Sequence, residues 1–361
     1  MKKRFLIVKP SSLGDVIHAF PAVSLLARHE PEAEIDWMVV PAFAPIVRYH
    51  PAVDGVILFR RKELGQLPKF PKAFSELLSG IRKARYDGVI DLQGLLRSAV
   101  ISRLAKTRVV AGPAVSREWG TGIFYQRRLD PGDRFRHAVR KNLSMMAEFL
   151  GVPEPDEAEF EFRGNPAAAQ RVVTLLRGFA KEKLIAVAPG ARWHSKQWPP
   201  EFFAETLNLF YRDHHDYSFV ILGAPDEKPL GEQLQKHLKA PAVNLIGLTG
   251  IPELVEAIRR SRLLFCNDSG PMHIAAALGT PLVCMFGPTD PVLTGPFSDR
   301  RWNASNVSAG SANTGSVTGQ FPPEMQKNPR KNCLGSETAL VIRRIPMYDM
   351  QEPNNCKELA L

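Results

Sequence analysis

The stretch that decides the fold is FLIVKPSSLGDVIHAFPAVSLLARH, residues 5–29. Its first part, Phe5–Lys9, is apolar up to the last residue and predicts a buried strand. Asp15–His29 has the apolar spacing of a helix, which Pro21 is expected to kink. A buried strand that leads directly into a helix begins a parallel βαβ unit, in which helices cover both faces of the sheet. The chain therefore opens as a Rossmann-like α/β domain.

The same alternation continues through two halves of the chain. A segment rich in Pro, Glu and Gly at 151–166 separates them and predicts an interdomain linker. Before it we expect strands at Ile35–Val40, Val56–Phe59 and Gly88–Leu92, and helices at Phe74–Ala84 and Leu95–Ala105. After it we expect strands at Leu184–Ala188, Phe219–Leu222, Val243–Ile246, Leu263–Cys266 and Leu282–Phe286, and helices at Phe202–Phe210, Glu227–Leu238, Pro252–Arg259 and Met272–Leu278. The predicted architecture is two doubly wound Rossmann-like domains, 1–160 and 161–300, facing a central cleft.

Residues 301–361 break this pattern. Asn, Ser, Gly, Thr and Pro dominate 303–336, without apolar periodicity, and Leu340–Ile345 is a short apolar run with no neighbouring element. Such a composition cannot bury enough apolar surface to order a chain. We therefore expect an atypical, disordered C-terminal tail.

Composition bounds the class of protein. The 361 residues are 44% hydrophobic and 23% charged, as in soluble globular proteins. No apolar run approaches the roughly 18 residues of a membrane span, and Lys9, Pro10 and Asp15 interrupt the start too early for a signal peptide. We expect a cytoplasmic protein. Four cysteines form no CxxC pair, and Cys266 and Cys284 lie in strand-like runs, so buried thiols are expected rather than disulfides or zinc.

Positive charge is concentrated in the first half. The net charge is +10, and residues 1–150 hold 25 Lys and Arg against 14 Asp and Glu. Arg60–Arg85 alone holds eight basic and two acidic residues. This is either an ordinary solvated face or a surface that meets an anionic partner. No nucleic-acid-binding motif is present, so an anionic membrane surface or a phosphorylated acceptor is favoured over nucleic acid.

The first candidate constellation is KPSSLGD, residues 9–15, between the first strand and the first helix. In a doubly wound domain this turn faces the ligand, and Gly14 permits close backbone approach. Asp15 either caps the helix or presents a carboxylate that can accept a proton from a hydroxyl. Lys9 would keep that carboxylate ionised. The motif is neither GxGxxG nor a P-loop, which disfavours NAD binding.

The second constellation is PGARWHSKQWP, residues 189–199, after the first strand of the second half. Arg192, His194 and Lys196 crowd a turn just before a helix N-terminus, where charge, N–H donors and the helix dipole suit an anion. The alternative is an ordinary basic surface loop. Trp198 is expected to pack the helix rather than to stack on a base.

The third constellation is NDSGPMH, residues 267–273, at the end of the strand Leu263–Cys266. Free backbone N–H groups there suit a phosphate, and Asp268 suits sugar hydroxyls. Alternatively, Asp268 or Ser269 only caps the following helix, and His273 is a structural histidine. GPTDP, residues 287–291, follows the next strand and either closes the same pocket or forms a plain turn.

These constellations, read in order, resemble glycosyltransferase family 9, the ADP-heptose:lipopolysaccharide heptosyltransferases of GT-B fold. The resemblance covers about residues 3–297. It rests on IVKPSSLGDVIHAFPA (7–22), DLQGLLRSA (91–99), APGARWHSKQWPPEFFA (188–204), LGAPDE (222–227), NDSGPMHIAAALGTPLV (267–283) and FGPTDP (286–291). It implies an inverting transferase without metal or other cofactor, which moves heptose from ADP-L-glycero-β-D-manno-heptose to an anionic lipid A–core acceptor. Kdo and the first heptose both stay open as the accepting sugar.

The resemblance also implies residue roles. Asp15 matches the general base, and the turn that holds Lys9, Ser11, Ser12 and Gly14 matches the acceptor side. The remaining site residues match the donor side. Lys196 matches the lysine for the donor phosphates, Glu227 an acidic residue near the adenosine ribose, Asp268 the heptose-binding aspartate, and Ser269, Gly270 and His273 a diphosphate cradle, with Arg192 beside it. The basic first half implies peripheral contact with the inner leaflet of the membrane.

The tail departs from the family, whose members end in a helix that packs back across the domains. Its onset at about Asp299 has the character of a frame-shifted or replaced end, which predicts an unstable or inactive enzyme. Four alternatives to a heptosyltransferase stay open. They are a glycosyltransferase for another nucleotide sugar, a sugar-nucleotide epimerase of similar architecture, a non-catalytic sugar-nucleotide binding protein, and a nucleic-acid binder.

Overall fold

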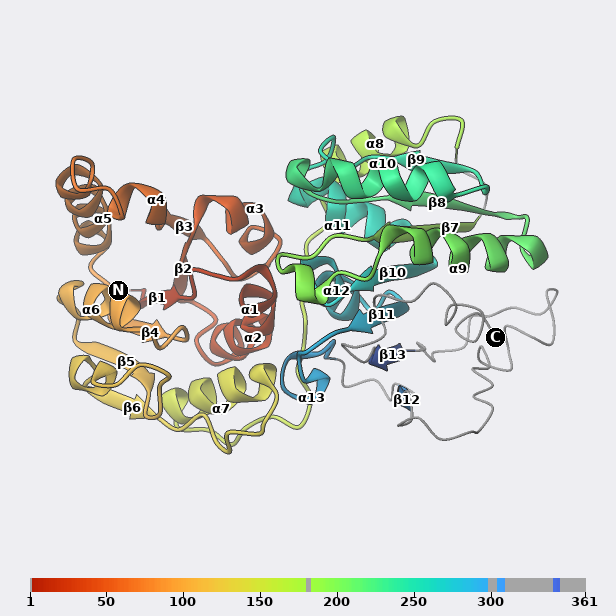
Figure 1. The fold of residues 1–361 in the computed structure, drawn as a ribbon. Coiled ribbons are helices and arrows are strands. Elements are labelled where there is room, and N and C mark those ends of the chain that lie inside the picture. Colours follow the sequence, from red (N-terminus) through yellow and green to blue (C-terminus); the bar gives the residue numbers. More distant parts are fainter. Residues whose placement is uncertain (1, 180–182, 298–303, 309–339, 345–361) are drawn as a thin grey trace. The chain divides into compact units, whose positions relative to one another are not determined.

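The computed structural model describes residues 2–179 and 183–297, and the backbone of two further strands at 304–308 and 340–344. The chain forms two compact units, Met1–Gly164 (unit 1) and Asn165–Leu361 (unit 2) (Figure 1). The acceptor-binding and donor-binding roles expected for the two domains, and the cleft between them, stay predictions.

Unit 1 is built on a parallel sheet of Rossmann type. Its strands lie in the order β3-β2-β1-β4-β5-β6. The first strand is central, the next two are added on one side of it, and the chain then crosses to add β4, β5 and β6 on the other side. We call the place between β1 and β4, where the order changes direction, the reversal point. The strands are β1 (Arg4–Val8), β2 (Glu34–Val39), β3 (Gly55–Leu58), β4 (Gly88–Asp91), β5 (Val109–Pro113) and β6 (Arg127–Leu129). In the central register, Leu6 lies opposite Asp36 on β2 and Val89 on β4.

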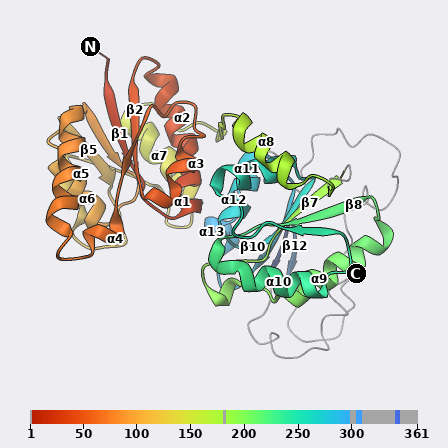
Figure 2. The ribbon, with the colours of Figure 1, turned by 90° about the horizontal axis from the view of Figure 1, so that it is seen from above.

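Helices cover both faces of this sheet because alternate side chains of each strand point to opposite sides. Leu6 and Val8 belong to one buried cluster with residues of α5 and α6. Phe5 packs edge-on against Phe149 of α7 on the other side. Figure 2 shows α5 and α6 on one side and α2 and α7 on the other. The helices of unit 1 are α1 (Leu13–His18), α2 (Phe20–His29), α3 (Ala44–Val47), α4 (Arg61–Leu64), α5 (Phe70–Ala84), α6 (Leu96–Leu104) and α7 (Ala138–Leu150), with 3-10 turns η1 (Pro41–Phe43) and η2 (Thr121–Phe124).

The predicted kinked helix over Asp15–His29 is wrong in detail. The chain forms two helices that are separated at Ala19, and Pro21 lies at the second position of α2. Proline lacks the N–H that a helix interior needs, but this N–H has no intrahelical partner in a first turn. Pro21 therefore starts a new helix instead of bending an old one.

The first five strands of unit 2 have the same arrangement as those of unit 1, and two further strands extend the sheet. The strands lie in the order β12-β13-β11-β10-β7-β8-β9, which changes direction between β7 and β10, and neighbouring strands are parallel. Its strands are β7 (Lys183–Ala188), β8 (Tyr217–Ile221), β9 (Ala242–Asn244), β10 (Leu263–Asn267), β11 (Leu282–Phe286), β12 (Ala304–Ser308) and β13 (Leu340–Arg344). Its helices are α8 (Pro166–Leu175), α9 (Pro200–Asp213), α10 (Lys228–His237), α11 (Ile251–Arg260), α12 (Gly270–Leu278) and α13 (Pro291–Thr294), with 3-10 turns η3 (His194–Lys196) and η4 (Pro225–Glu227). The predicted α/β class with two doubly wound sheets is confirmed.

Aromatic packing anchors the core of unit 2. Trp198 is buried and packs against Phe203 of α9 and Phe265 of β10, with ring centroids 5.1 and 6.0 Å away. The prediction that Trp198 packs its helix is thereby confirmed. Cys266 and Cys284 are buried free thiols, as expected, and burial raises the pKa of Cys284.

The predicted tail without structure is wrong at two places. β13 pairs in parallel with β11, Leu340 opposite Leu282, and β12 pairs with β13. The apolar run at 340–344 therefore finds its support in a strand that lies nearly sixty positions earlier in the chain, which local periodicity cannot reveal. The rest of the predicted tail, 301–303, 309–339 and 345–361, lies outside the described residues.

Candidate active site

The candidate residues gather at the reversal point of each sheet. In unit 1 they follow β1, and in unit 2 they follow β7 and β10, except for Glu227, which follows β8. At such a point the loops after two neighbouring strands diverge to opposite faces, so that a ligand can reach the carboxyl edge. Each unit thus carries its own group of polar side chains at the place where doubly wound domains bind ligands.

Asp15 is held at the N-terminus of α1, but it is not the cap. Ser12 is the N-cap, and Asp15 is the third helical residue. Oδ2 of Asp15 accepts hydrogen bonds from the backbone N–H and the Oγ of Ser12, both at 2.8 Å. This is a capping box, a pattern readable in the Ser-x-x-Asp spacing. Within the described part of the chain, Oδ1 accepts no hydrogen bond, so one oxygen stays available to a substrate proton.

Lys9 is buried beneath this turn. Its Nζ donates to the carbonyl oxygen of Leu92 at 2.5 Å and thereby ties the end of β1 to the end of β4. Burial lowers the pKa of Lys9, while the nearby charges of Asp15 and Asp91 act to raise it. The amine is therefore part of a buried charge arrangement beneath Asp15. Its expected contact with an acceptor stays a prediction.

The segment after β4 supports the same turn, which the residue-level reasoning missed. Oε1 of Gln93 accepts the backbone N–H of Ser11 at 3.4 Å. Gln93 is itself fixed by Asp91, which accepts from the N–H groups of Gln93 and Gly94 and from the hydroxyl of Tyr125. Burial raises the pKa of Asp91. The sequence signal for this support is the segment DLQG, residues 91–94, at the end of β4.

Unit 2 brings the second and third constellations together. Nζ of Lys196, at the end of η3, lies 2.6 Å from Oδ2 of Asp268, directly after β10. The side chain of Asp268 is 5% exposed and that of Lys196 24%. A largely buried carboxylate thus holds one ammonium group at the carboxyl edge of the sheet.

Asn267 fastens the turns around this pair and was also missed. Its Oδ1 accepts the N–H of Trp198 at 3.2 Å, and its Nδ2 donates to the carbonyl oxygen of Pro189 at 2.7 Å. The turn after β11 also packs here. Gly287 lies so close to Ser195 that a Cβ at residue 287 would overlap the carbonyl oxygen of Ser195. Three strand ends, those of β7, β10 and β11, therefore meet at the Lys196 turn.

Glu227 lies against the start of the same turn. Its Oε2 accepts the backbone N–H of Ala224 at 2.7 Å, and a Cβ at Gly190 would overlap its Oε1. A Cβ at Gly223 would come within 2.6 Å of Oε2. Burial raises the pKa of Glu227. Two glycines thus make the room in which this carboxylate sits.

The N-terminus of α12 completes the unit 2 group. Ser269 is its N-cap, Gly270 its first residue, and His273 is buried in the first turn. The unpaired N–H groups of a helix N-terminus attract anions. Arg192 is exposed and lies over the ring of Trp193, 5.6 Å from its centroid. The structure therefore gathers Lys196, Asp268, Ser269 and Gly270, while Arg192 points to a neighbouring aromatic ring.

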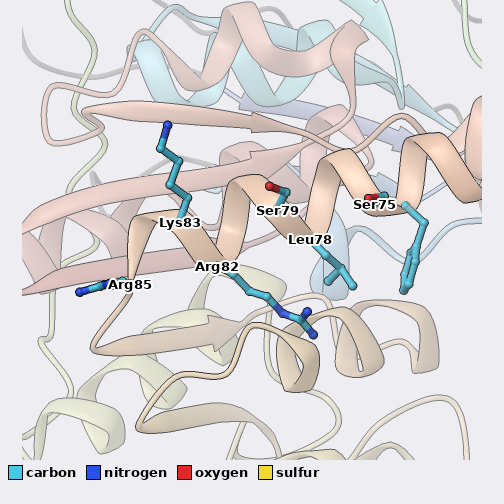
Figure 3. Close-up of a pocket in the computed structure, with 7 residues that line it drawn as sticks. Ser75, Leu78, Ser79, Arg82, Lys83 and Arg85 are labelled. Carbon is cyan, nitrogen blue, oxygen red and sulfur yellow. The ribbon is translucent and has the colours of Figure 1, made fainter.

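A surface hollow of about 770 Å³ lies elsewhere, along α5 (Figure 3). Arg82, Lys83 and Arg85 line it with Ser75, Ser79, Leu78 and Phe74. Lys83 and Arg82 project to different sides of the helix, and Nε of Arg82 donates a hydrogen bond to the carbonyl oxygen of Leu104. α5 ends just before β4 begins, so these cations lie at the amino edge of the sheet, opposite the edge of Asp15. They do not converge on one anion.

Comparisons with known proteins agree with this geometry. The model of glycosyltransferase family 9 (heptosyltransferase) matches residues 75–318, which extends beyond the onset of the atypical tail. Lipopolysaccharide heptosyltransferase 1 of Escherichia coli (strain K12) is 31% identical over 306 residues, which are 81% of this chain and 91% of that protein. The protein of the same name from Pseudomonas aeruginosa is 31% identical over 309 residues, 81% of each chain.

Solved structures give the same result. E. coli heptosyltransferase WaaC with ADP matches with a TM-score of 0.69 and 29% identity, over 82% of this chain and 91% of that one. WaaC with ADP-2-deoxy-2-fluoro heptose matches with a TM-score of 0.66 and 29% identity, over 80% and 90% of the two chains.

The two doubly wound sheets, together with the match to WaaC over most of both chains, place the protein among the glycosyltransferases of GT-B fold. Within that class the chain belongs to glycosyltransferase family 9, the heptosyltransferases, as its motifs predict.

Proposed function

We propose that the protein transfers heptose from ADP-heptose to the inner core of lipopolysaccharide, with inversion at the anomeric carbon. The observation that carries the donor half is the Lys196–Asp268 pair beside the N-terminus of α12. It combines one cation, free N–H donors and a buried carboxylate, which suit a diphosphate and the hydroxyls of a sugar. WaaC, a relative at 29% identity, is solved with ADP and with an ADP-heptose analogue.

In this reaction, Oδ1 of Asp15 accepts the proton of an acceptor hydroxyl. The hydroxyl oxygen then forms a bond to the anomeric carbon of the heptose, and the bond from that carbon to the β-phosphate oxygen breaks. ADP leaves as an anion, which Lys196 and the N–H groups at Ser269 and Gly270 stabilise. Proton acceptance by a positioned carboxylate contributes about 100- to 10,000-fold in rate. As written, no step requires a metal ion.

The other site residues receive supporting roles. Glu227, set between two glycines, is assigned to the ribose hydroxyls of adenosine, and Asp268 to the heptose. The buried His273 is assigned to the diphosphate cradle, and Arg192 to a place beside it. The turn of Ser11, Ser12 and Gly14, with Lys9 beneath it, is assigned to the acceptor sugar. For that sugar we propose Kdo, because the relatives quoted above are both named heptosyltransferase 1.

The same assignment implies a location. No helix in the described residues is long and apolar enough to cross a membrane. Lipid-linked acceptors lie in a membrane, and residues 1–150 carry the excess of basic residues. We therefore assign the protein to the cytoplasmic face of the inner membrane, held by peripheral contact.

A product assay tests the proposal. Purified protein is incubated with ADP-heptose and either Kdo-lipid A or a core that already carries one heptose, and the products are identified by mass. Heptose on Kdo-lipid A is the expected product. Asp15→Asn should lower turnover by roughly 100-fold or more while ADP binding is retained, whereas Asp213→Asn, an exposed carboxylate at the end of α9, should not. Equal turnover of Asp15→Asn and wild type would refute Asp15 as the base.

A further inference from the structure

Unit 1 exposes four large apolar side chains on the segments that follow β4 and β5. Leu96 is 45% exposed, Val115 75%, Trp119 98% and Ile123 74%. We call these four residues the apolar rim. Exposed aliphatic residues are common singly, but an almost fully exposed tryptophan and three exposed aliphatic residues on two segments that are in contact are typical of a binding surface.

The rim lies on the edge of the sheet that carries Asp15. Leu96 begins α6 after β4, and Val115, Trp119 and Ile123 follow the end of β5. Both loops therefore leave the carboxyl edge, as the Asp15 turn does after β1. They are also joined to one another, because the backbone N–H of Leu96 donates to Oε2 of Glu118 at 2.5 Å.

A second set of contacts links the rim to the Asp15 turn. A Cβ on Gly94 would lie 2.6 Å from Cγ of Pro113, so the loop after β4 and the end of β5 are in close contact. The same loop carries Gln93, whose Oε1 receives the N–H of Ser11. The rim and the proposed base are thus parts of one continuous edge.

The base of the rim is ordered, although its tips are exposed. Thr121 and Tyr125, on either side of Ile123, are 2% and 6% exposed, and the hydroxyl of Tyr125 donates to the buried Asp91. η2 packs against α6. These loops are packed by other, buried residues, so the four exposed apolar side chains are not required for folding. Their exposure therefore indicates an external binding partner.

The charges beside the rim identify that partner. Arg97 directly follows Leu96, and Arg117 lies two positions before Trp119; both are exposed. The acidic Glu118 lies between Arg117 and Trp119, and its carboxylate is bound by the N–H of Leu96. Tryptophan favours the interface between lipid headgroups and acyl chains, and arginine favours the anionic headgroups above it. We propose that the apolar rim is the surface by which unit 1 docks on an anionic lipid bilayer, with Trp119 at the headgroup level. This rests on the proposed function only for its purpose, which is to bring Asp15 to a lipid-linked sugar.

Vesicle co-sedimentation of the full chain tests the surface. The vesicles contain phosphatidylethanolamine and phosphatidylglycerol, without acceptor or nucleotide sugar. Trp119→Ser and the double variant Val115→Ser/Ile123→Ser should each partition roughly ten-fold less than wild type, since each removes apolar area from the bilayer. Trp119→Phe should keep most of the binding. Val173→Ser, a 41% exposed aliphatic residue on α8, is the matched control and should bind as wild type.

Two further comparisons test whether binding depends on the negative charge of the bilayer. Neutral phosphatidylcholine vesicles should bind less protein, and Arg117→Gln should weaken binding to the anionic vesicles only. Circular dichroism and melting of each rim variant check that folding is intact. Unchanged partitioning of folded Trp119→Ser and of the double variant would overturn the proposal. Because these vesicles contain no substrate, a protein that binds them through the rim but transfers no heptose would refute the proposed function and leave the surface standing.

Discussion

Lys196 and Asp268 form an ion pair of 2.6 Å between Nζ and Oδ2, although 72 residues separate them in the chain. The parallel sheet creates this pair, because β7 and β10 are neighbours and their carboxyl ends meet at one edge. A diphosphate that binds beside Lys196 must share the ammonium with a nearly buried carboxylate. Asp268 therefore both positions Lys196 and opposes a second negative charge close to it.

Removal of the charge of Asp268 should separate these two effects. In Asp268→Asn, repulsion between the carboxylate and the diphosphate is lost, so ADP should bind at least as tightly as to wild type. Hydrogen bonds to the heptose weaken, so kcat/KM for ADP-heptose should fall roughly 10- to 100-fold. Titration calorimetry with ADP and initial rates with ADP-heptose give the two values. A parallel fall of ADP affinity and kcat/KM would contradict a sugar-binding role for Asp268.

Substitution of Lys196, the ion-pair partner of Asp268, should instead weaken ADP binding. Lys196→Gln removes a charge-assisted hydrogen bond to the phosphates, so ADP affinity should fall roughly ten-fold or more. It also leaves the 5% exposed carboxylate of Asp268 without its ion-pair partner, which should lower Tm. Calorimetric titration and thermal melting measure both. Unchanged ADP affinity, despite a lowered Tm, would make Lys196 a structural residue only.

The glycine at position 190 should be needed for donor binding. A Cβ there would overlap Oε1 of Glu227, so Gly190→Ala forces this carboxylate out of its place. If Glu227 binds the ribose, ADP affinity should fall roughly ten-fold. Gly80→Ala is the matched control, since a Cβ at Gly80 in α5 meets nothing within 4 Å. It should leave ADP binding unchanged and raise the free energy of unfolding by up to about 1 kcal/mol.

The strands were predictable because buried parallel strands are continuous apolar runs. β11 was predicted with its observed bounds, Leu282–Phe286, and β7 and β10 to within a residue. β5, Val109–Pro113, and β6 were not predicted; β6 has only three residues, Arg127–Leu129, and two of them are arginines at the edge of the sheet. α7, Ala138–Leu150, was missed although Val139, Leu143 and Met146 have helical spacing and are buried.

The site was predictable as a set of motifs but not as a set of contacts. Sequence alone placed Asp15, Lys196 and Asp268 in strand-end turns, because doubly wound domains bind ligands there. It could not show that Lys196 and Asp268 pair, since that depends on β7 lying next to β10. It also missed Asn267 and Gln93, which act through other turns rather than on a substrate.

The hydroxyl of Ser12 should matter for the placement of Asp15. Ser12→Ala removes one of the two hydrogen bonds to Oδ2 of Asp15 and weakens the capping box of α1. Loss of such a cap costs about 1 kcal/mol of the free energy of unfolding. Ser11→Ala is the matched control for stability, because within the described residues Ser11 is hydrogen-bonded only through its backbone N–H, which donates to Gln93. Urea unfolding of both variants measures this difference, and equal midpoints would contradict the capping role.

His50 gives unit 1 a buried group that titrates. Its Nε2 lies 3.1 Å from both Oγ of Ser24 and the carbonyl oxygen of Phe20, and its Nδ1 accepts the N–H of Ala52 at 3.2 Å. An Nδ1 that accepts cannot carry a proton, so the neutral ring is the one that fits. Burial lowers the pKa of His50 from 6.5 to about 4.

Acidification should therefore destabilise the protein through His50. Above pH 6.5 the ring is neutral in the folded and the unfolded chain, and the full stability is present. Between pH 6.5 and about 4 the unfolded chain binds a proton that the folded chain refuses, so the free energy of unfolding falls, by about 3 kcal/mol in all. His50→Gln should unfold more easily at pH 7 but lose this share of the pH dependence, whereas His237→Gln, at an exposed position of α10, should keep it. Urea unfolding at pH 4.5, 5.5 and 7 measures both slopes, and parallel slopes for His50→Gln and wild type would show that His50 does not cause the acid sensitivity.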